Sequence, residues 1–448
     1  MPEPSATERL ADYAVALRFE ALPASAVALA KHCLIDAVAC AVFGRQFPWS
    51  AMVLEEATAT GAGGPCRLPG GAEQLHVPQA ALALGAFAHA FELDSLSKPG
   101  VGVHPGATVA LPAFAMAQAV GATGKDLITA IVAGIEVMFR IGSATLHSPE
   151  KVGFHAPGLT GPFGSAAACA ALMHLSAAQA ANAFGIAGSL AGGLLAFSKA
   201  DSGGMIKRLH LGRAAEGGII AARLAQRGYE GPRSVLEGRF GFLEAFCDET
   251  DRDLLTKGLG QVWEIERLCL KRYPCHVTSH APVQMLRDFM EQHCFAGDDI
   301  REIAIEASAK VAGQHNNADP ADIMLAQYSM PFAVALSAYH DPLYPDVFSE
   351  RTIADPRVRD LARRVQLTAA EDRKGWAVRM MVTLHDGKKF EGALDTFRGC
   401  PETPLSAEEL RMKFDRLTQN GSAEMRRALF DELMQLERLP SLQTLALS

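Results

Sequence analysis

The chain has 448 residues, of which 49% are apolar and 21% are charged, and its formal net charge is −8. The chain is longer than a domain with one ordinary hydrophobic core usually is, so we expect two domains, or one large domain with a smaller one attached. The negative charge balance argues against a nucleic-acid partner, which normally requires a basic surplus.

The nine cysteines form no C-x-x-C pair and have no regular spacing. The sequence therefore offers no ligand set for zinc or an iron–sulfur cluster, and we expect free thiols in a reducing cytoplasm. Met1 to Arg18 has no signal-peptide pattern, which argues against export. The uncharged run from Val152 to Ser198 is rich in Ala and Gly and contains Pro157 and Pro162. It favours buried helices over a membrane span, so we expect no membrane partner.

Apolar residues at helical spacing predict a succession of helices in the first half of the chain. Many of these residues are Ala or Gly, which is typical of buried helices that pack closely. The expected helices are Ala24 to Phe43, Gln79 to Glu92, Gly106 to Val120, Lys125 to Gly142, Gly164 to Met173, Ala177 to Leu195 and Gly212 to Arg227. We therefore predict an all-α domain over residues 1–267.

Short alternating runs of β-branched residues appear after about Gly260 and predict strands. The runs Ile303 to Ile305, Val378 to Leu384 and Lys388 to Leu394 alternate with helical patterns at His280 to Glu291, Met324 to Tyr339 and Ser406 to Glu437. Asp386-Gly387 is a two-residue hairpin signal. We predict a smaller α+β domain over 268–398 and a C-terminal helical segment over 399–448 that packs back on the first domain. The expected fold class is mostly α.

Several common phosphate-binding and hydrolase motifs are absent. The segment Gly100 to Gly106 has its third glycine one position late for a dinucleotide-binding turn, and no strand precedes it. The chain has no Walker loop, no His-Glu-x-x-His and no Gly-x-Ser-x-Gly sequence. We therefore expect an activity without metal or organic cofactor, if the chain is an enzyme.

Titratable side chains do occur in loops that are otherwise apolar. One group runs from His89 to Asp94 and on to His104, and a second contains His155. His104 could simply cap a helix, and His155 could be an ordinary core histidine. Glu92 and Asp94 are harder to explain as structural residues, because burying carboxylates without partners is costly.

Two basic segments complete the set. Lys207 to Glu216 stands at a predicted helix entrance, where backbone donors and cations would bind an anion, although a solvated basic turn is the alternative. Lys271 to His276 falls at the predicted domain junction, with His280 one helical turn beyond His276. The two histidines could bind a metal, but no third ligand lies nearby in the sequence, and the segment suits carboxylate recognition equally well.

Taken in order, these segments resemble the MmgE/PrpD family over nearly the whole chain. The resemblance also includes the helix from Leu22-Pro23 to Gly44 with Asp36, the run Val235 to Gly238, and Gly241-Phe242. It implies a homodimer of two-domain subunits that act on a small polycarboxylate, with an active site between the domains and no metal or organic cofactor.

The resemblance also implies the site residues. The pocket positions of the family fall on His104, His155, Lys207, Lys271 and Tyr328, which we expect to be catalytic. Tyr328 is placed by the run Gln327-Tyr328-Ser329-Met330-Pro331. The neighbouring residues expected to bind substrate are Asp94, His210, Arg213, Arg272 and His276.

One departure from the family bears on the reaction. Many members carry Asp-Phe-Asp-Asp-Thr where this chain has Glu92-Leu93-Asp94-Ser95-Leu96. A carboxylate and a hydroxyl are thus missing, which argues against dehydration, because expelling hydroxide needs a positioned acid. We therefore expect a cofactor-independent epimerase of an iminodisuccinate-like dicarboxylate. The alternatives are a 2-methylcitrate-like dehydratase, a cis-aconitate-like decarboxylase and a non-catalytic carboxylate-binding protein.

In each enzymatic alternative, negative charge builds up beside a carboxylate and must meet fixed cations in a dry pocket. Lys207 and Lys271 suit that role, and we expect them to share one pocket. His155, with either Tyr328 or Lys207, is expected to supply the acid and the base.

Overall fold

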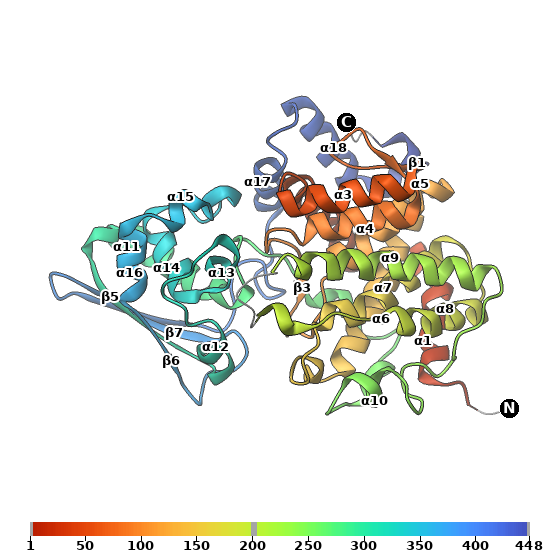
Figure 1. The fold of residues 1–448 in the computed structure, drawn as a ribbon, viewed down its shortest axis with the longest axis horizontal. Coiled ribbons are helices and arrows are strands. Elements are labelled where there is room, and N and C mark those ends of the chain that lie inside the picture. The colour runs from red at the N-terminus through yellow and green to blue at the C-terminus, as the bar shows by residue number, and fades with distance from the viewer. Residues whose placement is uncertain (1–2, 199–203, 446–448) are drawn as a thin grey trace. The chain divides into compact units, whose positions relative to one another are not determined.

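The structure is a computed structural model that describes residues 3–198 and 204–445, so the last three residues of the predicted C-terminal segment lie outside the described part. The chain divides into two compact units, and each is described here by itself (Figure 1). Unit 1 comprises Met1–Ala90, Asp94–Leu268 and Leu410–Ser448, and unit 2 comprises Phe91–Leu93 and Cys269–Glu409. The predicted domain limits at 267 and 398 stay a prediction.

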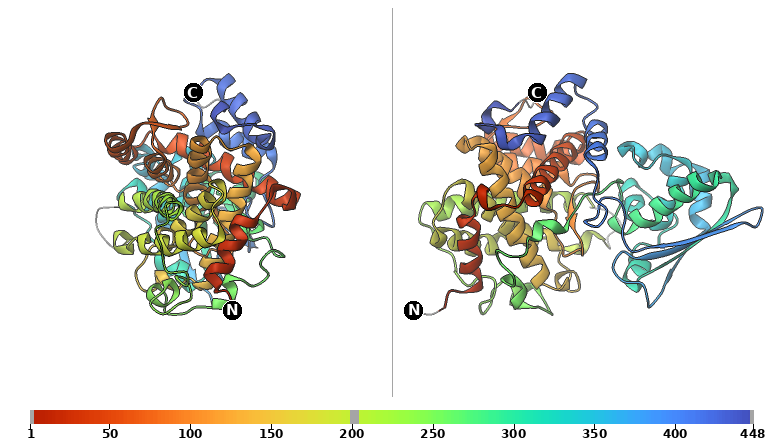
Figure 2. Two further views of the ribbon diagram at one scale, coloured as in Figure 1. Left: turned by 90° about the vertical axis from the view of Figure 1, so that its right-hand side faces the viewer. Right: turned by 180° about the vertical axis from the view of Figure 1, so that it is seen from behind.

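Unit 1 is built almost entirely of helices, with α7 packed against α6 and α9, and α4 packed against α9 (Figures 1 and 2). Its helices are α1 (Ala6–Ala16), α2 (Ala24–Gly44), α3 (Pro48–Gly61), α4 (Val77–Ala88), α5 (Leu111–Val120), α6 (Gly124–Ala144), α7 (Ala156–Leu172), α8 (Ala177–Leu190), α9 (Ile206–Gln226), α10 (Phe242–Phe246) and α18 (Ala423–Met434). Small residues allow the close approach: a Cβ added at Gly212 would lie 2.4 Å from the Leu82 carbonyl oxygen. The predicted close packing of Ala- and Gly-rich helices is confirmed.

Polar caps fix several helix starts in unit 1. Ser5, Thr123 and Ser176 each accept a hydrogen bond from the third residue of the following helix, whose side chain bonds back to the cap. This reciprocal arrangement satisfies two backbone N–H groups that a helix start leaves open. The predicted starts of α6 and α8 accordingly agree with the structure to within one residue.

Several sequence-based expectations for unit 1 are wrong. The first domain is not strictly all-α, because β1 (Ala62–Arg67) and β2 (Gln74–Leu75) form an antiparallel pair, and a short β3 (Leu96–Ser97) follows. Helix α8 ends at Leu190, α7 begins at Ala156, and α9 begins at Ile206. Pro157 fits the first turn of α7, where no backbone donor is needed, and Pro162 lies inside the helix without ending it.

Unit 2 contains a four-stranded sheet in the order β6-β5-β7-β8. Its strands are β5 (Ile300–Ala307), β6 (Val365–Ala369), β7 (Val378–Leu384) and β8 (Lys389–Leu394). Strands β5 and β6 are parallel, whereas β5–β7 and β7–β8 are antiparallel. The predicted hairpin is confirmed, with Gly387 at a positive φ of 88° in its turn. The parallel strand β6 has no counterpart among the sequence predictions.

Helices cover one face of this sheet, where α11 packs against β7 and β8 and α14 packs against β6 (Figures 1 and 2). The helices of unit 2 are α11 (His280–His293), α12 (Ala309–Gln314), α13 (Ile323–Tyr328), α14 (Met330–Tyr339), α15 (Glu350–Ile353) and α16 (Pro356–Arg363). The single helix predicted from Met324 to Tyr339 is therefore two helices. Ser329 interrupts it because its backbone is extended and its hydroxyl caps α14.

The end of the chain also forms two helices, not one. Helix α17 (Ala407–Leu417) is followed by α18, which contacts α2. A two-residue β4 (Leu268–Cys269) stands where unit 1 gives way to unit 2 along the chain.

Two helices are long and apolar enough to cross a membrane, by length and composition alone. They are Ala24–Gly44 and Gly124–Ala144, and 67% and 94% of their most apolar windows are buried inside the protein. The core helices of globular proteins pass the same test.

Candidate functional site

A tight turn after α4 places the polar side chains of His89 and Asp94 in the interior of unit 1. The helix ends at Ala88, four residues before its predicted end, and His89 caps it. The backbone of Glu92 then adopts a φ of 58°, in the left-handed region that non-glycine residues rarely occupy. Such strain is most often retained at functional sites. The turn leaves the side chains of His89 and Asp94 fully buried.

Asp94 holds two imidazole rings. The Nδ1 atom of His89 lies 3.0 Å from each carboxylate oxygen of Asp94, and the Nδ1 atom of His104 lies 2.9 Å from one of them. The His104 Nδ1 also lies 3.0 Å from the Ser95 carbonyl oxygen. Because carboxylate and carbonyl oxygens only accept, both Nδ1 atoms carry hydrogen and donate. Each ring therefore presents its Nε2 atom as the remaining polar group.

The charge state of this group follows from its burial. Burial alone would raise the pKa of Asp94, but the His104 and His89 rings hold that pKa well below its usual value. Burial lowers the pKa of His89 to about 3, and the nearby Lys207 ammonium adds to the shift. Asp94 is therefore an anion and His89 is neutral at physiological pH.

Lys207 extends this group from α9. Its side chain is only 3% exposed, and its charge contributes to the lowered pKa values of His89, His155 and His210. The Nδ1 atoms of His155 and His210 lie 3.2 Å apart. Lys207 stands in the first turn of α9, not ahead of the helix as predicted, since the helix begins at Ile206. We call these side chains the histidine cluster, and its members are His89, Asp94, His104, His155, Lys207 and His210.

The first three members could hold a metal ion by proximity. One ligand atom from each of His89, Asp94 and His104 lies within 4.8 Å of the others. However, the bond from His104 Nδ1 to the Ser95 carbonyl requires a hydrogen on that nitrogen, which therefore has no in-plane lone pair to offer a metal. The geometry fits a carboxylate that orients two imidazoles better than it fits a ligand set.

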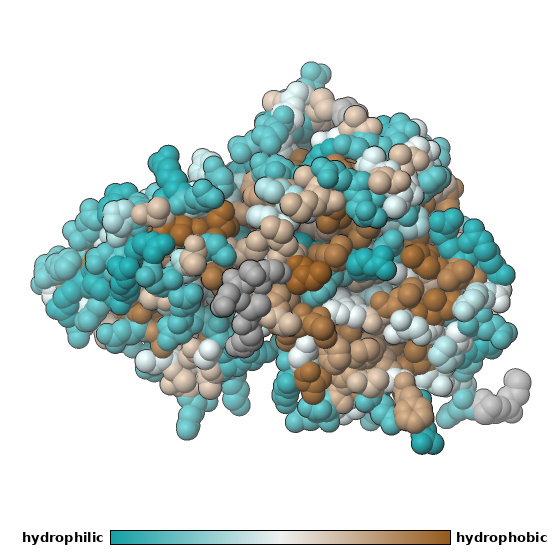
Figure 3. All heavy atoms as spheres, viewed as in Figure 1, coloured by the Kyte–Doolittle hydropathy of each residue, from teal (hydrophilic) through white to brown (hydrophobic). Residues whose placement is uncertain are grey.

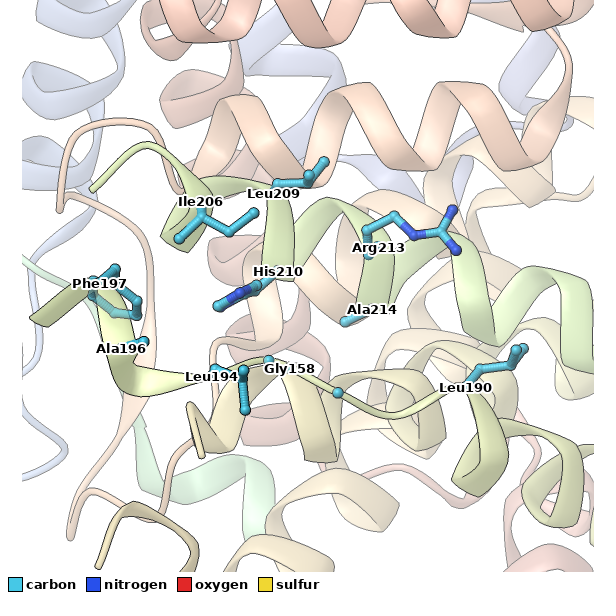
Figure 4. Close-up of a pocket in the computed structure, with 12 residues that line it drawn as sticks. Gly158, Leu190, Leu194, Ala196, Phe197, Ile206, Leu209, His210, Arg213 and Ala214 are labelled. Carbon is cyan, nitrogen blue, oxygen red and sulfur yellow. The ribbon is translucent and has the colours of Figure 1, made fainter. Parts of the chain in front are cut away.

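A pocket of 490 Å³ borders the histidine cluster in unit 1 (Figure 4). Its walls are Gly158, Leu190, Gly192, Gly193, Leu194, Ala196, Phe197, Ile206, Leu209, His210, Arg213 and Ala214. His210 projects from α9 toward the segment that carries Leu194 and Ala196 (Figure 4). Apolar side chains gather on this face of unit 1 over α9 and the segment after α8 (Figure 3). Arg213 is ion-paired with Glu216 on the same helix.

Unit 2 contains a second group of polar residues, centred on a buried ion pair. The Lys271 Nζ atom lies 2.9 Å from a Glu92 carboxylate oxygen, and both side chains are at most 2% exposed. The Gln327 amide donates to the carbonyl oxygens of Phe91 and Pro274 and so joins the backbones on both sides of the pair. Lys271 therefore faces a fixed counter-charge.

Three rings pack together in the same unit, and of these only His276 and His315 are stacked. The ring centroid of His276 lies 4.1 Å from that of His315 and 5.1 Å from that of Tyr328. His315 also donates from Nδ1 to the Tyr328 carbonyl at 2.9 Å. Arg272 pairs with Glu409 at 3.7 Å. Elsewhere in unit 2 the buried His280 ring packs on Phe397, so the two histidines of the predicted pair have different ring neighbours.

The predicted site residues thus fall into two groups. Unit 1 brings together His104, His155, Lys207, His210 and Asp94, with Arg213 at the adjoining pocket, and unit 2 holds Lys271, Arg272, His276 and Tyr328. That Lys207 and Lys271 share one pocket stays a prediction. Asp94 was expected to bind substrate, but its hydrogen bonds favour a positioning role.

Sequence reasoning did not assign a role to His89, Glu92, His315 or Gln327. A signal existed for the first two, because a histidine at the end of an apolar helix followed by two acidic residues is uncommon in a core. His315 and Gln327 carry no such signal, since their partners are backbone carbonyls distant in sequence.

Comparison with known proteins identifies the family of the chain. Residues 8–255 match the N-terminal domain of the MmgE/PrpD family and residues 273–436 match its C-terminal domain. The chain is 28% identical to a cis-aconitate decarboxylase of Aspergillus terreus over 98% of this chain and 94% of that protein. It is 29% identical to the human cis-aconitate decarboxylase over 75% of this chain and 71% of that protein. The predicted resemblance is confirmed, and the chain belongs to the MmgE/PrpD family.

Proposed function

We propose that this protein is a carbon–carbon lyase that decarboxylates cis-aconitate or a close analogue. The observation that carries the proposal is the buried Asp94 carboxylate that orients two imidazoles beside the Lys207 ammonium. The names of the relatives support the decarboxylase alternative of the sequence analysis, and they give no support to the epimerase that we expected first.

The reaction needs a fixed positive charge and a proton donor. A carboxylate on the saturated carbon next to a carbon–carbon double bond leaves as carbon dioxide, and the electron pair of the broken bond forms a new double bond to that carbon. The original double bond then supplies its electrons to its far carbon, which takes up one proton. Stabilising the negative charge that develops on this path in a dry pocket accelerates the reaction.

The histidine cluster can supply both requirements. The ammonium of Lys207 lies close enough to three imidazoles to contribute to their lowered pKa values, after the larger effect of burial. Of the two histidines that bond to Asp94, only His104 is partly exposed, with 14% of its side chain accessible to solvent. Its Nε2 is the nitrogen left for substrate. We assign the charge-stabilising role to Lys207 and the proton-donating role to the imidazolium form of His104, whose Nε2 carries the proton that is transferred, with Asp94 as the positioning residue.

Product analysis in deuterated water tests the proposal. Incubation with cis-aconitate should release carbon dioxide and give a five-carbon dicarboxylate with one deuterium, as followed by proton NMR. Addition of water would instead identify a hydratase or dehydratase. Deuterium exchange with inversion of a dicarboxylate such as iminodisuccinate would identify an epimerase, and binding without turnover would identify a carboxylate-binding protein.

A matched pair of variants links the activity to the cluster. His104→Gln should lower decarboxylation strongly, because glutamine cannot donate a proton. His385→Gln is the control, since His385 is exposed in the β7–β8 turn and lies outside the cluster. Equal loss of activity in both variants would contradict the assignment.

A further inference from the structure

We propose that His89 is a positioning residue for the decarboxylation, because its ring holds the Asp94 carboxylate that orients His104. This inference rests on the proposed function and adds a residue to the machinery of the same site. His89 does not touch substrate in this arrangement, and its effect on the reaction passes through Asp94.

The contacts of Asp94 distinguish its two histidine partners. The Nδ1 atom of His89 lies 3.0 Å from each carboxylate oxygen, whereas the Nδ1 atom of His104 lies 2.9 Å from Oδ2. His89 therefore contacts the whole carboxylate group, and His104 contacts one oxygen of it. A carboxylate that shifted sideways would lengthen one of the His89 contacts, so this ring keeps Oδ2 in place for His104.

The position of Oδ2 matters because His104 has a second acceptor. Its Nδ1 atom also lies 3.0 Å from the Ser95 carbonyl oxygen. One N–H group is thus shared between a carboxylate and a carbonyl. A small displacement of Asp94 would leave this hydrogen with the carbonyl alone. The His104 ring would then lose the negative charge that stabilises its imidazolium form.

The end of α4 fixes His89 independently of Asp94. The backbone N–H of His89 bonds to the Gly85 carbonyl oxygen as the helix ends, and the side chain is 0% exposed. Its ring packs edge to face against His104, with the centroids 4.6 Å apart. A group held by a regular element and by packing is a precise anchor for another side chain.

The second ring nitrogen of His89 argues against a role in packing alone. Burial lowers the pKa of this ring to about 3, so the ring is neutral and its single hydrogen is on Nδ1. The Nε2 atom is buried and makes no hydrogen bond to the described part of the chain. A buried acceptor in that state lowers stability, and an apolar side chain would avoid it. The Nδ1 donor is therefore the property that a histidine contributes here.

Three substitutions separate this donor from the ring that carries it. An asparagine amide nitrogen can take the place of Nδ1, because both nitrogens are bonded to Cγ, whereas a glutamine amide reaches the place of Nε2. Leucine has no donor. We expect His89→Leu and His89→Gln to lower kcat for cis-aconitate about 10- to 100-fold, as loss of a hydrogen bond to a charged group does. KM should not change, because His89 is fully buried. His89→Asn should recover most of the lost kcat.

His32→Leu is the matched control. His32 is partly buried on α2 of unit 1 and lies outside the histidine cluster. This control should keep the kcat and KM of the wild type. Thermal unfolding verifies that each variant is folded, and if His89→Leu does not fold, the comparison of His89→Gln with His89→Asn carries the test.

NMR tests the contact without turnover. Isotope-labelled histidine reports the hydrogen-bonded imidazole N–H protons of the intact protein. His89→Leu and His89→Asn both lack the His89 ring, so the ring current of that residue is absent from both spectra. The His104 Nδ1 proton should differ in chemical shift between the two, because only asparagine supplies a second donor to Asp94.

The outcomes separate the two proposals. Folded His89→Leu and His89→Gln proteins with wild-type kcat overturn the inference and leave the proposed function intact. The same holds for an asparagine variant as slow as the leucine variant, or for a rise in KM with kcat unchanged. If the wild type decarboxylates no acid, the proposed function fails and NMR decides the inference. Equal His104 shifts in the leucine and asparagine variants then overturn it, and different shifts uphold it.

Discussion

Replacing Asp94 by asparagine removes one charge from the centre of the histidine cluster and keeps the shape of the side chain. Both Nδ1 atoms that face Asp94 are donors. Both also contact the same carboxylate oxygen, Oδ2, so an asparagine oxygen in that place would accept from both rings without the charge, and the asparagine N–H groups would meet the His89 Nδ1 at the third contact. The His89 imidazole must therefore turn or change its tautomer.

The size of the effect follows from these contacts. Hydrogen bonds to a charged group contribute about 1.5–3 kcal/mol each, and Asp94→Asn weakens two and abolishes one. We expect a loss of about 3 kcal/mol of transition-state stabilisation, or about a hundredfold in kcat. The KM should change little, because Asp94 is fully buried behind the rings. Alkaline conditions should not restore the activity, since the missing charge does not return.

Steady-state decarboxylation kinetics, with the folded state verified by circular dichroism, provide the assay. Asp355→Asn is a suitable control, because Asp355 accepts a hydrogen bond from His340 at 3.4 Å in unit 2, outside the cluster. A folded Asp94→Asn protein that retains kcat within about threefold of the wild type would refute the positioning role, since one lost charge-assisted bond already exceeds that.

Three further predictions concern other buried charges, and a fourth concerns metal. Lys207→Ala should lower turnover in steady-state kinetics by about a hundredfold or more, as loss of a preorganised charge typically does. Lys207→Arg should restore binding better than turnover. Near-normal turnover in the alanine variant would contradict this. Glu92→Gln should lower the free energy of unfolding by about 3–5 kcal/mol in urea, because it removes the carboxylate charge that faces the buried Lys271 ammonium at 2.9 Å; an unchanged midpoint would contradict this. The free energy of unfolding should fall as pH drops from 6.5 toward about 3, because unfolding lets His89 regain its ordinary pKa and bind a proton; constant stability across that window is the contrary result. Activity should survive exhaustive chelation, and restoration of a chelated, inactive protein by a divalent ion would disprove this.

Local signals in the sequence predicted the long helices well. Helix α6 begins after the Thr123 cap and α2 after Pro23, and both keep an apolar pattern over their whole length. The start of α9 was missed because its first turn lacks such an apolar pattern. Its first turn carries Lys207 and Arg208, which are 3% and 4% exposed, so charged residues occupy positions that periodicity assigns to apolar ones.

The end of α4 was missed because nothing in its sequence marks it. Glycine usually supplies a left-handed turn after a helix, but here the left-handed residue is Glu92. The membership of the histidine cluster, apart from His89, followed from the family resemblance and not from local patterns, because its members come from segments far apart in the chain. Their pairing did not, since the bonds of Asp94 to His89 and His104 depend on that unusual turn.

The ion pair of Glu92 and Lys271 also limits how this protein can recombine with its relatives. Glu92 lies inside the stretch that matches the N-terminal family domain, whereas Lys271 falls between the two matched stretches. A chimera joined between residues 255 and 270 would take the carboxylate from one parent and the ammonium from the other. Such exchanges should yield folded protein only when both parents carry compatible charges at these positions, so the two residues should be inherited as one unit.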